Sequence, residues 1–494
     1  MSSTEVELKL ALPIAEPALL ARRLARSPVL ARLAPARRRV YSLYHDTPAL
    51  DLLHQRVALR LRREEGEGAP RWLQTLKTAG RGDSALSQRG EWEMPVAGAA
   101  LELRRLGASP WPRIDPHGHI AAALQPCFAT DFERTCWTVR QRDGSVVEVA
   151  LDVGAVVAGD RRLPLCELEL ELKAGPPAAL FALAQRLARQ VAVLPLAASK
   201  AERGYALRAS GTPAPVLARP PVLSRRMPLP RVAGLALGEA FRQFTANLDA
   251  LHQGGEDPEF VHQARVGWRR FRSLARLLRP ALAEPPPAAT ALEPLLHALG
   301  TLRDLDVART QTLPAWAEAY AEGQPARAAQ WQALMAAAEP AARRARHAVR
   351  TALARPAVGA ALLAQQAWLH AVEQADGAAE GADARDWLRQ RTERLARRLG
   401  QARQAGGDAQ AQHRARILAK RLRYSAEAFE GLLPKRLLRH QRLACGLQES
   451  LGAERDLAQA AALAAELQAG TGPAEFLRGV AAGRRSCHPH DCLN

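Results

Sequence analysis

The chain has 494 residues and a formal net charge of +19, from 69 lysines and arginines against 50 aspartates and glutamates. Single hydrophobic cores stop growing near roughly 250–300 residues, so the length excludes one core and predicts two or three domains. The positive charge predicts an anionic partner, such as polyphosphate, nucleic acid or an anionic membrane.

The first part of the chain, residues 1–210, is predicted to be mainly strands that are separated by Gly, Pro and Asp turns. Strands are expected at 4–11, 38–45, 56–63, 71–78, 88–95, 131–141, 145–153 and 164–173, with amphipathic helices at 15–26 and 177–191. Successive side chains of a strand point to opposite faces. The run TEVELKLAL therefore places Glu5, Glu7 and Lys9 on one face and apolar residues on the other.

Other strands carry charge in the same alternating pattern. The shared faces hold Arg60 and Arg62, Thr75 and Lys77, Glu91 and Glu93, Glu148 and Asp152, and Glu167, Glu169 and Glu171. Enclosed charges are costly unless they pair or bind ions. A closed antiparallel barrel would direct all these faces into a polar lumen. The alternative is a two-layer sheet with one charged, solvated face.

These residues resemble the CYTH family, which comprises class IV adenylate cyclases and thiamine triphosphatases and is also called the triphosphate tunnel metalloenzymes. The resemblance covers 1–210 and includes, besides the strands above, Arg134 in TDFERTCW, Ser199-Lys200 and Arg203-Gly204-Tyr205. It implies an eight-stranded antiparallel tunnel that binds a triphosphate and depends on Mg²⁺ or Mn²⁺.

The resemblance also implies roles for individual residues. Metal binding is expected of the carboxylates Glu5, Glu7, Glu167 and Glu169, with Glu171 and Asp152 as supports. Phosphate oxygens are expected to contact the catalytic residues Lys9, Arg60, Arg62 and Lys77 and the substrate-binding residues Arg134, Lys200 and Arg203. This division is chemically consistent, because Mg²⁺ prefers carboxylate and phosphate oxygens while cations stabilise the charge of a departing phosphoryl group.

A Pro-rich segment, 211–231, is predicted to be a semi-rigid linker that does not join a core. After it, residues 232–485 have the Ala, Leu, Arg, Glu and Gln content and the i, i+3, i+4 apolar spacing of helices. The fold class predicted for the whole chain is thus multidomain. An N-terminal antiparallel β-barrel tunnel (α+β) precedes an all-α pair of helical bundles with a pseudo-twofold repeat.

The repeat, at about 232–330 and 385–485, is visible in matching basic residues and in LGTLRDLD, which aligns with LGAERDLA. One stripe starts at His262 and the other at His413, and each lies along one helix face. The expected polyphosphate-binding residues are His262, Arg265, Arg269, Arg270 and Arg272, and His413, Arg416, Lys420, Arg421 and Arg423. The alternatives are a solvated basic face for the stripes and helix caps for the histidines.

These stripes resemble the CHAD (conserved histidine α-helical) domain over about 230–485, a family known to bind polyphosphate and often fused behind a CYTH domain. The second copy has Ala458 where the first has Asp306, so a contact by this acid would be absent there. The order of domains resembles that of bacterial inorganic triphosphatases.

The function that follows is metal-dependent hydrolysis of inorganic triphosphate to pyrophosphate and phosphate, with a helical part that binds polyphosphate. An adenylate cyclase or thiamine triphosphatase would use the same tunnel, and a non-catalytic polyphosphate-binding scaffold is a further alternative. Inorganic triphosphate and polyphosphate are the expected partners; nucleic acid is the less favoured anion, and no membrane is expected.

The six cysteines show no paired framework, no signal-peptide pattern is present, and no apolar run reaches the roughly 18 residues that span a bilayer. A cytoplasmic location is therefore expected, with polyphosphate granules as a candidate place of association. Residues 486–494, which contain Cys487, His488, His490 and Cys492, are predicted to be a disordered tail rather than a metal site.

Overall fold

The computed structural model describes residues 3–13, 16–78, 80, 85–209, 214–375, 383–404, 409–467 and 471–487. Within these ranges the side chains of 409–413, 440–454 and 485–487, among others, are not described. The chain divides into two compact units, of which the first comprises 1–215, 252–255 and 353–367 and the second the remainder. Residues 488–494 of the predicted tail lie outside the described residues.

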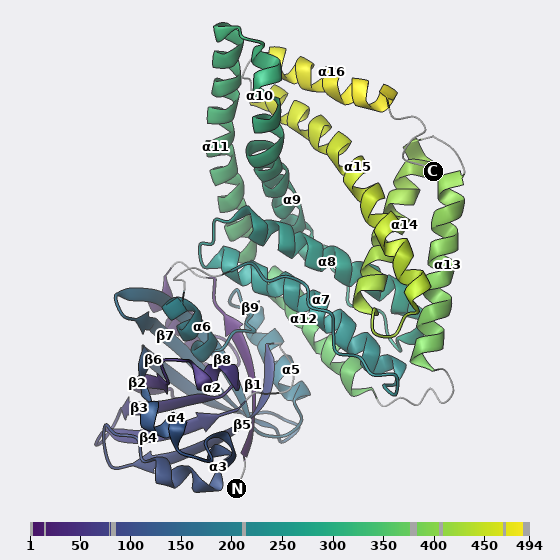
Figure 1. Cartoon of the computed structure of the whole chain (residues 1–494). Coiled ribbons are helices and arrows are strands. Elements are labelled where there is room, and N and C mark those ends of the chain that lie inside the picture. The colour runs from purple at the N-terminus through teal and green to yellow at the C-terminus, as the bar shows by residue number, and fades with distance from the viewer. Residues whose placement is uncertain are drawn as a thin grey trace. The chain divides into compact units, whose positions relative to one another are not determined.

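The first unit contains a closed antiparallel barrel (Figure 1). Its strands are β1 (Ser3–Ala11), β2 (Ala36–Asp46), β3 (Ala58–Glu65), β4 (Arg71–Lys77), β5 (Leu86–Val96), β6 (Gln125–Arg140), β7 (Val146–Ala158) and β8 (Arg161–Ala174), with a short β9 (Leu194–Pro195) beside β1. The strand order is β5-β4-β3-β2-β6-β7-β8-β1, and pairing between β1 and β5 closes the ring. The predicted barrel is confirmed, and the open two-layer alternative is wrong.

Alternation along the strands separates lumen from core. In β1, Glu7 and Lys9 face the lumen, while Leu8 and Leu10 are fully buried in an apolar cluster. Residues of α1 (Pro17–Ala25) and α5 (Ala178–Ala188) belong to the same cluster. Burial of apolar surface on the outer face thus stabilises the barrel and leaves the charged faces free to point inward.

Short elements that the sequence pattern did not reveal complete this unit. They are α2 (Asp51–His54), η1 (Leu103–Ala108), α3 (Trp111–Ile114), α4 (His119–Ala123) and α6 (Lys200–Ala209). Helix α6 begins with Ser199 as a reciprocal cap: its hydroxyl accepts from the Glu202 N–H, and the Glu202 carboxylate accepts from the Ser199 N–H.

One buried carboxylate joins β2, α2 and α6. Asp46 is fully buried and accepts hydrogen bonds from the backbone N–H groups of Thr47, Leu52 and Leu53 at 2.7, 2.9 and 3.0 Å. The hydroxyl of Tyr205 in α6 donates to the same carboxylate at 2.8 Å. Asp46 therefore fixes α6 to the barrel, and α6 carries Lys200 and Arg203.

The second unit is helical. It includes α7 (Leu229–His252), α8 (Pro258–Leu278), α9 (Glu293–Val307), a π-helical turn (Ala308–Thr312), α10 (Leu313–Ala321), α11 (Pro325–Leu353), α13 (Ala384–Gln404), α14 (Ala409–Ala428), α15 (Lys435–Glu466) and α16 (Thr471–Cys487). Helix α12 (Pro356–Gln374) has residues in both units. The repeated His-Arg stripes lie on α8 and α14, which pack together. The first LGTLRDLD copy lies in α9, whereas its counterpart continues without interruption through the long α15.

The Pro-rich segment is held more firmly than its composition predicts. The side-chain amide of Asn247, fully buried in α7, accepts from the Val216 N–H and donates to the Val216 carbonyl. Glu239 accepts from the Arg219 N–H at 3.1 Å. Backbone groups of the segment from Val216 thus form hydrogen bonds with side chains of α7. Amino-acid composition does not predict such contacts.

None of the helices in the described ranges combines the length and the apolar character that crossing a membrane would require.

The buried Asp46 carboxylate gives a testable prediction about stability. Asp46→Ala would leave the three N–H donors and the Tyr205 hydroxyl without their acceptor, and each unsatisfied buried group costs about 1–3 kcal/mol. We expect the variant to lower the midpoint of chemical unfolding of the barrel clearly. Asp160→Asn, at an exposed position, is the control and should leave this midpoint unchanged. Equal midpoints for the two variants would contradict the role of Asp46.

Candidate functional site

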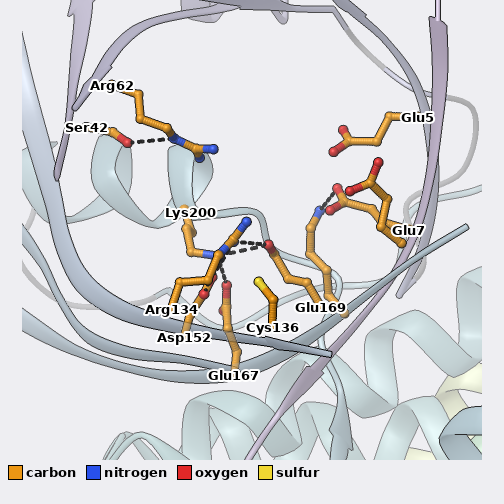
Figure 2. Close-up of polar contacts among 12 residues, drawn as sticks. Glu5, Glu7, Ser42, Arg62, Arg134, Cys136, Asp152, Glu167, Glu169 and Lys200 are labelled. Carbon is orange, nitrogen blue, oxygen red and sulfur yellow. Dashed lines mark hydrogen bonds and ion pairs between the residues drawn. The ribbon is translucent and has the colours of Figure 1, made fainter. Parts of the chain in front are cut away.

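The barrel encloses a cavity of about 570 Å³ whose wall is unusually charged. Of its 26 lining residues, 10 are basic and 8 are acidic, so a ligand inside must tolerate charges of both signs. The charges come from many strands and from α6. The faces predicted from alternation do point toward one lumen, as Figure 2 shows for Glu5, Glu7, Arg62, Asp152, Glu167 and Glu169.

One side of the lumen holds three carboxylates, Asp152 of β7 and Glu167 and Glu169 of β8 (Figure 2). Asp152 and Glu167 are fully buried, and one ligand atom from each of the three lies within 4.8 Å of the others. They meet because Asp152 pairs directly with Glu167 across the β7–β8 ladder. This pairing places carboxylates side by side, which is costly without cations nearby.

Cations from α6 and β6 compensate this cluster. The Lys200 ammonium lies 2.7 Å from Asp152 Oδ2 and 2.8 Å from Glu169 Oε1, and it also contacts Glu167. Arg134 donates to Asp152 from Nε and Nη2, at 2.7 and 2.6 Å, and its Nη2 also donates to Glu169 at 2.7 Å. Arg203 pairs with Glu167.

The compensation keeps Asp152 and Glu169 ionised. Burial by itself raises the pKa of Asp152, but Arg134 and Lys200 outweigh it and hold the pKa below the usual value. The pKa of Glu169 is lowered against burial in the same way, by Lys200 and then Arg134. The Lys200 pKa is raised, because the three carboxylates outweigh its burial.

This donor set fits a hard divalent cation. Three carboxylates offer the oxygen ligands that Mg²⁺ and Mn²⁺ prefer. The Lys200 ammonium lies among all three, so the cluster is already shaped around one small cation. Asp152, which the sequence placed as a support, lies at the centre of the cluster.

The other predicted metal ligands lie elsewhere on the wall (Figure 2). Glu5 is paired with Lys77 at 2.9 Å and with Arg89 at 3.0 Å, and Glu7 is paired with Lys9 at 2.8 Å and with Arg89 at 2.5 Å.

Glu171 is a third predicted ligand outside the cluster. It is partly exposed and contacts Lys173 at 2.6 Å, and burial raises its pKa. The structure thus brings together three of the six predicted ligands as a close group.

Across the lumen from the cluster lies a basic wall (Figure 2). Arg62 Nε donates to Ser42 Oγ at 3.3 Å, and Arg60 lies 3.4 Å from Glu91. The pKa of Arg62 is lowered to about 10 by burial and by Arg60 and Arg134. Burial and the neighbouring arginines thus destabilise the charged form of the Arg62 guanidinium. An anion bound beside it would compensate this positive charge.

Sequence reasoning missed several residues of this wall. Tyr44 lines the cavity, stacks on Phe128, and has its pKa lowered against burial by Arg60 and Arg62. Arg89 and Glu64 also line the cavity. Alternation could have found all three, because they share faces with Ser42, Glu91 and Arg62 respectively.

In the second unit, cations from four helices converge. Arg265 and Arg269 of α8 lie close enough to Arg303 of α9, Arg416 and Lys420 of α14 and Arg455 of α15 to influence one another. Burial, then Arg269, Arg416 and Arg455, lower the Lys420 pKa to about 7. His262 belongs to the same group, and burial, Arg303 and Arg269 lower its pKa to about 4. We call these seven residues the helical cation cluster.

Other predicted polyphosphate ligands point to different surroundings. Arg270 is buried, pairs with Glu427 and lies over the Tyr424 ring, and Arg423 contacts the same Glu427 at 2.8 Å. The Glu427 carboxylate thus joins α8 to α14, a tertiary ion pair that the stripe pattern did not reveal.

The remaining predicted ligands in the second unit are also separated. Arg421 has its pKa lowered by burial and by Arg276 and Arg398, outside the helical cation cluster. Arg272 is exposed. The side chain of His413 lies outside the described residues. Arg303 and Arg455 occupy matching positions in LGTLRDLD and LGAERDLA, but the repeat alone assigns them no role.

The acid that only the first repeat contains has a structural explanation. Asp306 is fully buried and lies 3.7 Å from both Arg309 and Arg346. Both arginines favour the ionised form of this acid, but burial outweighs them and raises the pKa of Asp306. In the second repeat Ala458 offers no carboxylate at this position, and α15 continues through it without interruption.

Comparison with known proteins now identifies the two parts. Family models match residues 3–205 as a CYTH domain and residues 235–465 as a CHAD domain. The chain carries a CYTH domain followed by a CHAD domain. The predicted resemblances are confirmed. The lumen described above is the CYTH tunnel, and the helical cation cluster lies in the CHAD domain.

Individual relatives resemble parts of this CYTH–CHAD chain. An inorganic triphosphatase from Haemophilus influenzae (strain ATCC 51907 / DSM 11121 / KW20 / Rd) is 36% identical over 168 residues, 33% of this chain and 44% of the relative. The match thus spans less than half of that relative's length. The crystal structure of the CHAD domain from the plant Ricinus communis is 30% identical, with a TM-score of 0.49, and covers 56% of this chain and 94% of its own.

A further structure is described as a putative adenylyl cyclase, HpAC1, from Hippeastrum that reveals a dominant triphosphatase activity. It is 18% identical, with a TM-score of 0.29, and covers 43% of this chain and 98% of its own.

The position of Lys200 yields a prediction about metal binding. A divalent ion that uses the three carboxylates must displace the ammonium that now contacts them, so Lys200→Met should bind Mn²⁺ about tenfold more tightly than the native chain without phosphate. Isothermal titration calorimetry measures this. Lys173→Met is the matched control, because it removes the same charge from a lysine that pairs with a single carboxylate. Unchanged or weaker binding in a folded Lys200→Met variant would refute the prediction.

Proposed function

We propose that the chain hydrolyses inorganic triphosphate to pyrophosphate and phosphate inside the CYTH tunnel, with Mg²⁺ or Mn²⁺ as cofactor. The observation that carries this proposal is the convergence of buried cations on one lumen beside a three-carboxylate cluster, of which Glu169 lines the cavity while Asp152 and Glu167 lie fully buried behind it. The similarity to an inorganic triphosphatase supports it. Phosphoryl transfer depends on placing charges around the transferring group, and this lumen consists mostly of such charges.

In the proposed reaction, the cationic residues of the tunnel would contact the phosphate groups and the carboxylates would hold the metal ion. The proposed phosphate ligands and catalytic cations are Lys9, Arg60, Arg62, Lys77, Arg134, Lys200 and Arg203. The metal ligands would be Asp152, Glu167 and Glu169, with Glu5, Glu7 and Glu171 contributing from the adjoining wall. A bound divalent ion would screen the phosphate charge and polarise a phosphoryl oxygen.

The chain's own part of the reaction is mainly electrostatic. Arg60 and Arg62 are almost fully buried, so their attraction for phosphate oxygens is little screened by water. As the terminal phosphoryl group departs, negative charge grows on the pyrophosphate that remains. Fixed guanidinium groups stabilise this charge without reorganisation, which lowers the barrier.

The tunnel lining favours an inorganic substrate over a nucleotide or thiamine triphosphate. Among the described lining residues Tyr44 is the one aromatic side chain, and its ring is already stacked on Phe128 at 4.6 Å. Adenine or a thiazolium ring would find mostly charged partners. A triphosphate alone satisfies these charges without burying an apolar ring against them.

Arg62 offers a test of catalysis. Arg62→Ala should lower kcat/KM for triphosphate by about 10²–10³, the usual loss when one preorganised donor to a transition state is removed. Phosphate release with Mg²⁺ measures it. Arg63→Ala, on the other face of β3 and 44% exposed, is the matched control and should retain nearly full activity.

Three outcomes would contradict this function. A native chain that forms cyclic AMP from ATP as its main reaction would be a cyclase, and preferred hydrolysis of thiamine triphosphate would identify that substrate. Polyphosphate binding without turnover of any of these compounds would identify a scaffold.

We further propose that the helical cation cluster binds polyphosphate. Its supporting feature is the crowding of like charges, because Lys420 loses charge near neutral pH unless an anion compensates its neighbours. Arg is a good bidentate ligand for phosphate oxygens, and six cations from four helices could contact successive phosphate groups.

The Lys420 pKa of about 7 predicts a pH-dependent affinity. A bound polyanion favours the ammonium form, so binding takes up a proton above pH 7 and the affinity should fall as the pH rises from 7 to 9. Binding of medium-length polyphosphate across this range measures the effect. Lys420→Arg keeps its charge and should flatten the profile, whereas Lys435→Arg, outside the cluster, should not. An equally steep profile in Lys420→Arg would refute the assignment.

A further inference from the structure

Glu64 is a carboxylate that lies apart from the three-carboxylate cluster, on the side of the tunnel that carries Arg60 and Arg62. Glu64 is on the same face of β3 as Arg60 and Arg62, two residues beyond Arg62 and next to the end of the strand. It lines the cavity and is only 6% exposed. Glu91 and Glu93 already pair with Arg60 on this wall, whereas Glu64 lies beside Arg62 and the more exposed Arg38 and Arg71. A buried acid at this second position weakens the attraction of the wall for phosphate, so it requires an explanation of its own.

Three arginines surround Glu64. Arg71 contacts Glu64 Oε2 at 3.0 Å, while Arg62 and Arg38 lie 3.6 and 3.9 Å from Oε1. Although burial opposes it, the Arg38, Arg62 and Arg71 charges lower the pKa of Glu64. The carboxylate is therefore ionised at neutral pH and occupies a position that a phosphate group would otherwise find attractive.

The exposure of these residues shows where along the tunnel Glu64 lies. The side chains of Arg60 and Arg62 are each 8% exposed, whereas Arg38 is 28% and Arg71 68% exposed. Glu64 thus lies between the enclosed pair and the two more open arginines. Without Glu64, these four arginines would form one continuous track for a polyanion that extends toward solvent.

We propose that Glu64 ends the phosphate track and limits the tunnel to short polyphosphates, which makes it a determinant of chain length. A triphosphate would occupy the enclosed part beside Arg60 and Arg62. A longer chain would have to place its next phosphate beside an ionised carboxylate, which repels it and already neutralises Arg38 and Arg71. Such repulsion of the wrong ligand is a common source of specificity.

This inference rests on the proposed triphosphatase function, and the experiment separates the two. Glu64→Gln removes the charge with little change of shape. It should raise the ratio of kcat/KM for tetrapolyphosphate to that for triphosphate about tenfold. Glu65→Gln is the matched control: it makes the same charge change at the next residue, which is 40% exposed and pairs with Arg63. It should leave the ratio unchanged.

The outcomes are distinct. If neither the native chain nor the variants release phosphate, the proposed function fails. The role of Glu64 is then tested by calorimetry without divalent cations, as the ratio of the affinity for tetrapolyphosphate to that for triphosphate, which Glu64→Gln should still raise. Because the CHAD domain is identical in both variants, the difference between Glu64→Gln and Glu65→Gln reports on the tunnel. If Glu64→Gln changes kcat/KM for both substrates by the same factor, Glu64 only balances the charge of its arginines and the inference is overturned.

Two further variants test the inference even if Glu64→Gln fails to fold. Glu64→Asp keeps the charge and should keep the native ratio. Arg71→Ala, at a well-exposed position, leaves Glu64 less neutralised and should lower the ratio of tetrapolyphosphate to triphosphate turnover. A ratio that stays native or rises in Arg71→Ala would also overturn the inference.

Discussion

Charge enclosed in a barrel has to be balanced within a few ångströms, and this requirement governs the tunnel. The apolar outer faces of the strands pack against helices, so the charged faces point inward together. Carboxylates that neighbour each other across the β7–β8 ladder would repel one another strongly. The ammonium of Lys200 and the guanidinium of Arg134 stabilise the ionised forms of Asp152 and Glu169. In the proposed function, each of these ion pairs is a place where a substrate or a metal ion would exchange partners.

The CYTH tunnel and the helical cation cluster differ in how far their cations are paired with acids. In the tunnel, acids and bases are nearly equal in number among the lining residues, and most cations already contact a carboxylate. In the helical cation cluster, cations lie near one another and the Lys420 pKa falls toward neutrality. The first arrangement suits a small substrate that arrives with a metal ion. The second suits a polyanion that supplies the missing negative charge.

Glu64 and Glu427 show how single acids set boundaries in arginine-rich surroundings. Glu64 interrupts a row of arginines in the tunnel, and Glu427 diverts Arg270 and Arg423 from the helical cation cluster into a link between helices. Arginine is abundant throughout the chain, so the few acids within such clusters decide which guanidinium groups stay available to a ligand.

The sequence by itself determined the strands of the barrel, the face on which each charge lies and the repeat in the helical half, whereas the pairing of β1 with β5 that closes the barrel is tertiary. The properties that the sequence determined follow from periods of two and 3.6 residues, which are local. Only the tertiary structure decided the partner of each charge: Lys200 among three carboxylates, Glu64 among three arginines, Asp306 between Arg309 and Arg346. These choices depend on strand register, on the placement of α6 by Asp46 and on helix crossings, which join residues far apart in the chain. Periodicity fixes the face of a strand or helix to which a side chain points. The distance between two charged side chains that are far apart in the sequence is set only by the folded structure.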